Sequence, residues 1–200
     1  MPRDANNLSA YYGMRSADFG PQANDVETTG SAYGLSQELA LESWIKLRLS
    51  YDRVDMDPEP GTVADYHNER SSYRIGLVPR IQTGPATIAL SFESLRIQSR
   101  ESESGGWEFF GAGKRSRSGF GIGGSTEFAI GANMTALGEA TGYSVEDIEV
   151  LEATMRLSYR LDGHGIHGMS LFIQGCDRQF ARDDAELRER DLRLGLKFHF

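Results

Sequence analysis

The chain has little of what marks several large protein classes. Its 200 residues include one cysteine, Cys176, and six prolines. A single cysteine excludes an intramolecular disulfide framework and any metal site built from several cysteines. No stretch of the sequence approaches the ~18 consecutive apolar residues of a membrane-spanning helix, so a helical membrane protein is excluded. The net charge of −8 argues against nucleic acid as a partner, because phosphates would be repelled.

A secretory signal is also missing from the start of the sequence. Residues 1–7 are mostly polar and contain no apolar core. We therefore expect either a cytoplasmic protein or a mature chain from which the signal peptide has been removed, and other features must decide between them.

Alternation of apolar and polar residues is the main pattern present. It is clearest in residues 45–52, 151–161 and 192–200. Successive side chains of a strand point to opposite faces, so each of these segments has one apolar and one charged face. The 23 glycines agree with many strands joined by tight turns. The pattern predicts an all-β fold.

Ten strands in a single domain, residues 1–200, account for the alternation. An eight-stranded fold is the alternative, because Lys114, Arg115 and Arg117 interrupt the sixth segment and weaken it and its neighbour. The ten strands are predicted at residues 6–19, 30–40, 44–56, 69–82, 85–99, 108–122, 126–141, 149–161, 167–180 and 190–200.

The predicted connections alternate in length. Short ones are expected near residues 41–43, 83–84, 123–125 and 162–166, and longer acidic ones near 20–29, 57–68, 100–107, 142–148 and 181–189. Short turns at one end and long loops at the other are typical of an up-and-down membrane β-barrel.

Charge pairing across predicted hairpins supports an antiparallel meander, because opposite charges facing each other stabilise a sheet. The predicted turns place these residues opposite each other: Glu38 and Lys46, Ser36 and Arg48, Arg74 and Glu93, Glu152 and Arg178, Arg156 and Gln174.

Alternation alone does not say which face of the sheet points outward. A soluble, lipocalin-like ligand-binding barrel turns its apolar face inward, whereas a membrane barrel turns it outward to lipid. The alternation is compatible with both kinds of barrel.

The final eight residues decide between the soluble barrel and the membrane barrel. They read Arg193-Leu194-Gly195-Leu196-Lys197-Phe198-His199-Phe200. This resembles the terminal assembly signal of bacterial outer-membrane β-barrels, in which Arg193, Gly195, Phe198 and Phe200 occupy the pattern positions. The resemblance implies a closed antiparallel transmembrane barrel in the bacterial outer membrane. It also implies contact with outer-membrane lipid, a signal peptide already removed, and recognition of the last strand by the barrel-assembly machinery.

In such a barrel the charged faces of the strands would line the lumen, since lipid does not tolerate them. Two interpretations stay open: a salt-bridge network that fills the interior, which we favour, or a narrow charge-lined pore. The predicted lumenal charges are Arg15, Glu38, Lys46, Arg48, Asp52, Arg74, Glu93, Glu127, Glu152, Arg156, Arg160, Arg178, Arg193 and Lys197.

No cofactor, metal site or catalytic residue is predicted. His164 and His167 lack a third ligand, and we expect Cys176 to be an unreactive lumenal thiol. One acidic group is similar to the aspartate and histidine couples of omptin-type outer-membrane proteases, although here all its members fall in a single loop region. The group is Asp55, Asp57, Asp65 and His67. The prediction is a non-enzymatic structural or surface-interaction protein, with an outer-membrane hydrolase as an alternative.

Overall fold

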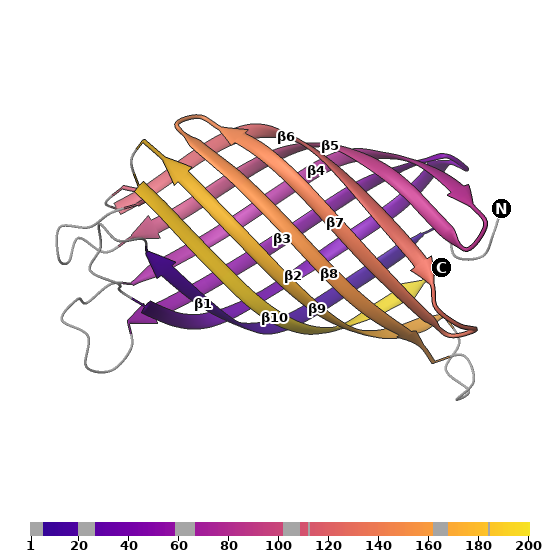
Figure 1. Ribbon diagram of the computed structural model, residues 1–200. Coiled ribbons are helices and arrows are strands. Elements are labelled where there is room, and N and C mark those ends of the chain that lie inside the picture. The colour runs from indigo at the N-terminus through magenta and orange to yellow at the C-terminus, as the bar shows by residue number, and fades with distance from the viewer. Residues whose placement is uncertain are drawn as a thin grey trace.

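The computed structural model shows ten antiparallel strands closed into a barrel (Figure 1). It describes residues 6–19, 27–58, 67–101, 109–111, 113–161, 168–183 and 185–200. Each strand pairs with its neighbours in sequence, and β10 pairs with β1. The strands are β1 (Asn7–Phe19), β2 (Glu27–Glu42), β3 (Ile45–Pro58), β4 (Asn68–Thr83), β5 (Ala86–Glu101), β6 (Gly113–Ala129), β7 (Met134–Val145), β8 (Ile148–Arg160), β9 (Met169–Arg182) and β10 (Ala185–His199).

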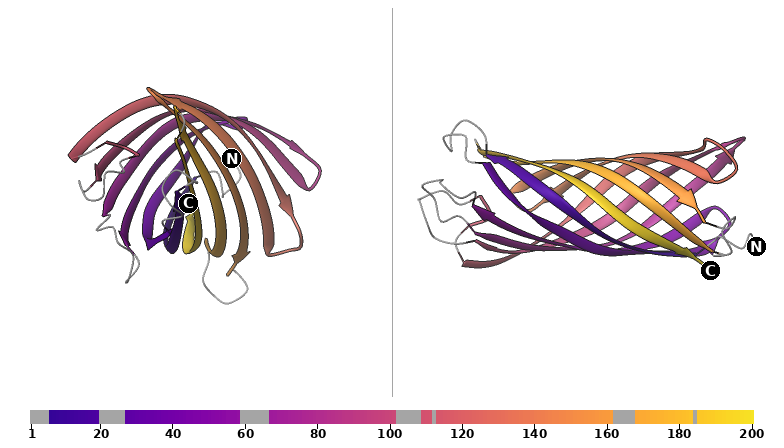
Figure 2. Two further views of the ribbon diagram at one scale, coloured as in Figure 1. Left: turned by 60° about the vertical axis from the view of Figure 1, so that its left-hand side comes forward. Right: turned by 90° about the horizontal axis from the view of Figure 1, so that it is seen from below.

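The prediction of a closed all-β barrel with ten strands is confirmed, and the eight-stranded alternative is wrong. The described residues contain no helix long and apolar enough to cross a membrane. β1 begins and β10 ends at one end of the barrel (Figure 2), which we call the terminal end. The opposite end is called the loop end.

The sixth and seventh strands lie further along the chain than the predicted ranges 108–122 and 126–141. The expected turn at residues 123–125 is inside β6, where Gly123 pairs with Ser91 on one side and Thr141 on the other. A Cβ atom at Gly123 would meet the side chains of Thr141 and Ser91, so glycine here allows close approach of neighbouring strands. The connection that does follow β6 comes at residues 130–133.

Two of the three predicted hairpin registers are wrong by two residues. Glu38 pairs with Arg48 because a bulge between Ala40 and Glu42 shifts the β2–β3 ladder. Arg74 pairs with Leu95, because the β4–β5 turn falls on residues 84–85 instead of 83–84. The β8–β9 register is confirmed: Glu152 faces Arg178 and Arg156 faces Gln174. A shift of two residues keeps every side chain on its predicted face.

The predicted contrast between short and long connections is only partly correct. Only residues 146–147 separate β7 from β8, and only 183–184 separate β9 from β10, where longer acidic loops were expected. Residues 161–168 form a longer connection than predicted at the terminal end. Glu146 and Asp183 both take positive φ values, 52° and 49°, which suits tight turns of this kind.

The apolar faces of the strands point outward. Leu194 is 64% exposed, Leu157 39% exposed, and Leu47 partly exposed, while Arg178 and Arg193 face inward and are buried. Such an exposed apolar surface suits lipid hydrocarbon and not water. The soluble lipocalin-like alternative, which requires these leucines in a central core, is therefore wrong.

Leu194→Arg tests this orientation. Placing a charge on the lipid face near the middle of β10 should destabilise the folded barrel by about 2–4 kcal/mol. Ser16→Arg is the matched control, since Ser16 is exposed towards the loop end of β1 and should cost only about 0–1 kcal/mol near the interface. Urea unfolding in phospholipid vesicles measures both. Equal losses would contradict the outward orientation.

Candidate functional site in the barrel lumen

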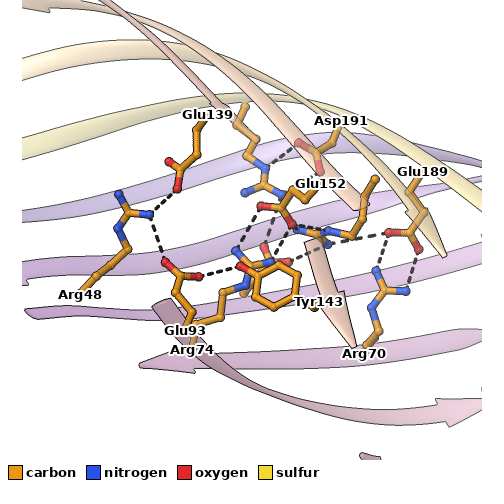
Figure 3. Close-up of polar contacts among 12 residues, drawn as sticks. Arg48, Arg70, Arg74, Glu93, Glu139, Tyr143, Glu152, Glu189 and Asp191 are labelled. Carbon is orange, nitrogen blue, oxygen red and sulfur yellow. Dashed lines mark hydrogen bonds and ion pairs between the residues drawn. The ribbon is translucent and has the colours of Figure 1, made fainter. Parts of the chain in front are cut away.

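The middle of the lumen holds a network of buried ion pairs, which we call the ionic lattice (Figure 3). Asp52 lies at its centre, 3.7 Å from an Arg15 nitrogen, 3.5 Å from one of Arg178 and 3.7 Å from one of Arg193. The side chains that form it come from β1, β3, β4, β8, β9 and β10. They are Arg15, Asp52, Arg70, Arg74, Glu152, Arg178, Glu189, Asp191 and Arg193.

Several contacts within the ionic lattice are bidentate or shared between strands. Arg74 donates two hydrogen bonds to Glu152, at 3.2 and 2.8 Å. Arg178 Nε donates to the same Glu152 at 2.6 Å. Arg193 donates to both oxygens of Asp191, at 2.6 and 2.8 Å. Paired, charge-assisted bonds of this type are stronger than neutral ones and fix the geometry of the side chains.

A second group of charges surrounds Arg48, closer to the terminal end. Arg48 donates to Glu38 at 3.3 Å, to Glu93 at 3.2 Å, and also to Glu139. Lys46 donates to Glu38 at 2.9 Å. We call these five side chains the Arg48 cluster.

The two groups balance each other in charge. Together they contain seven cationic side chains and seven carboxylates, each in an ion pair with another member. Removing charges from water is costly unless they are paired and hydrogen-bonded. The balance explains how a lumen this polar is compatible with a folded barrel.

Ten of the fourteen predicted lumenal charges lie in the ionic lattice or the Arg48 cluster. The other four are inward-facing but lie nearer the terminal end: Glu127, Arg156, Arg160 and Lys197. Arg156 stacks over the ring of Phe172, 5.5 Å from its centroid.

The sequence prediction missed four members of these groups: Arg70, Glu139, Glu189 and Asp191. Three of them carried a usable signal, because each is an even number of residues from a predicted lumenal charge in the same predicted strand segment. Glu189 was missed because its position was expected in a loop.

The loop end of the lumen is closed by aromatic rings, a feature the sequence did not predict. Phe109, Phe110 and Phe180 pack edge to face, with centroids 5.1 to 6.2 Å apart. Arg70 lies over the rings of Phe110 and Phe180, joining them to the ionic lattice. We call the buried set the apolar plug: Ala17, Ala32, Val54, Met56, Leu95, Ile97, Phe109, Phe110, Tyr143, Val145, Ile148, Val150, Phe180 and Leu187.

Hydrogen bonds fix Phe109 and Phe110 in the lumen. The Glu101 carboxylate accepts their backbone N–H groups, at 3.2 and 2.8 Å. Arg182 donates to the carbonyl of Phe109 at 2.9 Å, and Arg117 donates to that of Phe110 at 2.7 Å. These contacts satisfy backbone groups that would otherwise be buried without partners. The sequence did not reveal this arrangement, because Glu101 was expected in a loop, and Phe109 and Phe110 at the start of a strand.

Asp147, in the turn between β7 and β8, connects the two arginines that hold the plug. It accepts a hydrogen bond from Arg117 Nε at 2.9 Å and lies 2.7 Å from Arg182 Nε. Partial burial tends to raise the pKa of Asp147, but the Arg117 hydrogen bond and the two positive charges outweigh it and lower the pKa below its usual value. The carboxylate therefore stays ionised at neutral pH.

The residues of the terminal pattern divide between the two faces of β10. Phe198 and Phe200 are exposed on the outer surface, and Arg193 belongs to the ionic lattice. Gly195 faces inward beneath the ring of Phe172, which occupies the space that a Cβ atom would need. An aromatic ring covering a glycine on the neighbouring strand is a known way of stabilising sheets.

The remaining candidates do not form a catalytic arrangement within the described residues. Cys176 is buried in the lumen. His67 Nε2 lies 3.8 Å from Asp55 Oδ1, at the rim of the loop end. Three further candidate residues, His164, His167 and Asp65, lie outside the described part of the chain, as does the side chain of Asp57.

Glu189→Gln tests the ionic lattice. It keeps the shape of the side chain but leaves Arg15 and Arg70 without their shared carboxylate, so the loss of stability should be about 3–5 kcal/mol. Asp177→Asn is the control, because Asp177 pairs with Arg188 on the outer surface and should lose less than about 1 kcal/mol. Urea unfolding measures the stability of both variants. Similar losses of stability in the two would contradict the stabilising role of the ionic lattice.

Comparison with known proteins finds similarity at the level of fold. No protein-family model and no curated protein matches the sequence. The outer membrane protease OmpT from Escherichia coli aligns over 100% of this chain and 98% of its own, with a TM-score of 0.60 and 10% identity. The COG4313 outer membrane channel from Pseudomonas putida F1 aligns over 98% of this chain and 96% of its own, with a TM-score of 0.52 and 9% identity.

A third similar structure is the translocator domain of the autotransporter NalP from Neisseria meningitidis. It aligns over 100% of this chain and 90% of its own, with a TM-score of 0.50 and 12% identity. The three proteins share this architecture although their names describe a protease, a channel and a translocator. The closed ten-stranded barrel, with charges inside and apolar side chains outside, therefore has the fold of the bacterial outer-membrane β-barrel proteins.

Proposed function

We propose that the chain is a non-enzymatic protein of the bacterial outer membrane that acts as a structural or surface-interaction barrel with a filled lumen. The observation that carries this proposal is the closure of the interior, first by the ionic lattice and then by the apolar plug. A solute passing through would have to break several buried ion pairs and displace three packed phenylalanine rings.

Cavity size supports a lumen that does not conduct. The cavity between the Arg48 cluster and Arg193 has a volume of about 90 Å³. That space holds several water molecules, since one needs roughly 10–15 Å³ on the same scale. The cavity lies on the terminal side of the apolar plug, so water inside it has no open route to the loop end.

The outer surface of the barrel supports two parts of the proposal: that lipid surrounds the protein, and that the assembly machinery recognises β10. Exposed large apolar side chains occur on every strand except β3, where Leu47 and Leu49 are partly exposed, and β7, where the exposed apolar side chain is that of Ala140. Phe198 and Phe200 stand on this surface at the terminal end of β10, accessible to the barrel-assembly machinery before the strand closes against β1.

The hydrolase alternative has less support. A shared fold does not imply a shared activity, so the likeness to a protease does not transfer its chemistry. The carboxylates of the ionic lattice are all engaged by arginines. Asp55 on β3 and His67 just before β4 lie on a single rim.

Planar-bilayer recording tests the filled lumen. The wild type should show no discrete current steps, and Arg156→Ala and Arg193→Ala should remain silent, because the plug still closes the loop end. Heat-modifiable migration of the same sample confirms that folded barrels were used. Wild-type current steps whose size changes in Arg193→Ala would show that the lumen conducts.

Hydrolysis assays test the alternative. Wild type and His67→Ala should release the same background amount from fluorogenic peptides and from phospholipid vesicles. Turnover by the wild type that disappears in His67→Ala would instead establish an outer-membrane hydrolase.

A further inference from the structure

A group of metal-binding side chains lies on the outer face of the barrel at the rim of the loop end. Asp55 on β3, Glu69 on β4 and His67 just before β4 each offer one ligand atom, and the three atoms lie within 4.8 Å of one another. We propose that these residues bind one divalent transition-metal ion of the zinc type and that the ion links β3 to β4 at the rim.

The spacing of the three ligand atoms fits a coordination sphere better than a set of hydrogen bonds. His67 Nε2 is 3.8 Å from Asp55 Oδ1 and 3.7 Å from Glu69 Oε1. Both distances exceed the hydrogen-bond range of about 2.7–3.2 Å. Ligands held about 2.0–2.1 Å from a tetrahedral ion lie roughly 3.4 Å apart. The two distances from His67 Nε2 therefore exceed the tetrahedral spacing by a few tenths of an ångström only.

The sheet register places two like charges together at this point. Asp55 and Glu69 are directly opposite each other in the β3–β4 ladder. Directly opposed like charges destabilise a sheet. Arg53 lies 3.7 Å from Glu69 and offsets part of the charge, but no arginine or lysine among the described residues is in an ion pair with Asp55. A bound cation would offset the rest.

An unsatisfied carboxylate oxygen gives a second, independent indication. Although the Asp55 side chain as a whole is 40% exposed, its Oδ1 atom is itself shielded from solvent and accepts no hydrogen bond from any described residue. It is the same oxygen that lies nearest to His67 Nε2. Buried carboxylate oxygens are normally hydrogen-bonded or bound to a cation, so this atom is oriented as a ligand would be.

The chemistry of the three ligands selects the class of ion. Imidazole suits zinc, copper, nickel and related ions, whereas calcium and magnesium prefer oxygen ligands alone. Three protein ligands leave a coordination position for water. The side chains are 42%, 40% and 35% exposed for His67, Asp55 and Glu69, so an ion can enter directly from solvent.

Cobalt binding tests the proposal on the untagged full chain, folded in detergent at about pH 8, where an ordinary histidine with a pKa near 6.5 is neutral. Titration with Co²⁺ should give visible absorption that saturates at one ion per chain. Zn²⁺ should abolish the absorption, and Ca²⁺ in excess should not. Zn²⁺ should also raise the unfolding temperature, because a ligand bound only to the folded state stabilises it.

Matched variants locate the site. His67→Ala should abolish saturable binding, and Asp55→Asn and Glu69→Gln should each weaken it at least 10-fold. The double variant His164→Ala/His167→Ala, which removes two histidines outside the proposed site, should bind like the wild type. Heat-modifiable migration confirms folding of each variant.

Two results would overturn the proposal. One is saturable binding that survives His67→Ala or disappears in His164→Ala/His167→Ala. The other is a wild type that shows no saturable Co²⁺ binding below millimolar concentration.

Discussion

Closure of β10 against β1 is the constraint on which the rest of the structure depends. In hydrocarbon each backbone amide must find a partner within the protein, and an open sheet edge cannot meet that demand. The β1–β10 ladder runs from Asn7 opposite His199 to Phe19 opposite Leu187. This closure determines which side chains each face can carry. The outward face of the closed barrel contacts lipid, and the polar side chains of the inward face must form hydrogen bonds and ion pairs with one another.

The interior meets that requirement in two ways along its length. In the middle, arginines and carboxylates from different strands neutralise one another, so charges removed from water keep their partners. Towards the loop end, packed aromatic and aliphatic side chains need no polar partner. Arg70 joins the two regions, since it binds Glu189 and lies over the rings of Phe110 and Phe180.

Much of this arrangement could be predicted from the sequence, because alternation with a period of two is a local property of each strand. The number of strands, the apolar and the polar face of each strand and most of the charges on the polar faces came from that pattern, whereas the orientation of those faces came from the terminal residues Arg193 to Phe200. Turn positions and bulges were harder to predict from the sequence. Gly123 looks like a turn residue but lies inside β6, where it allows close approach of neighbouring strands, and the bulge near Ala40 shifts the whole β2–β3 ladder. The apolar plug escaped prediction because a loop segment supplies Phe109 and Phe110, whose partners lie far away in the sequence.

The contact of Gly195 with Phe172, and of that ring with Arg156, means that one small residue serves two separate demands. The terminal pattern that we propose the assembly machinery reads has glycine at this position, and the interior needs the same glycine to leave room for the ring of Phe172, which also contacts the Arg156 guanidinium. Any larger residue at position 195 would depart from the proposed assembly pattern and would also displace the packed ring of Phe172. We therefore expect a substitution at this one position to affect both the assembly of the barrel and the packing of the finished fold.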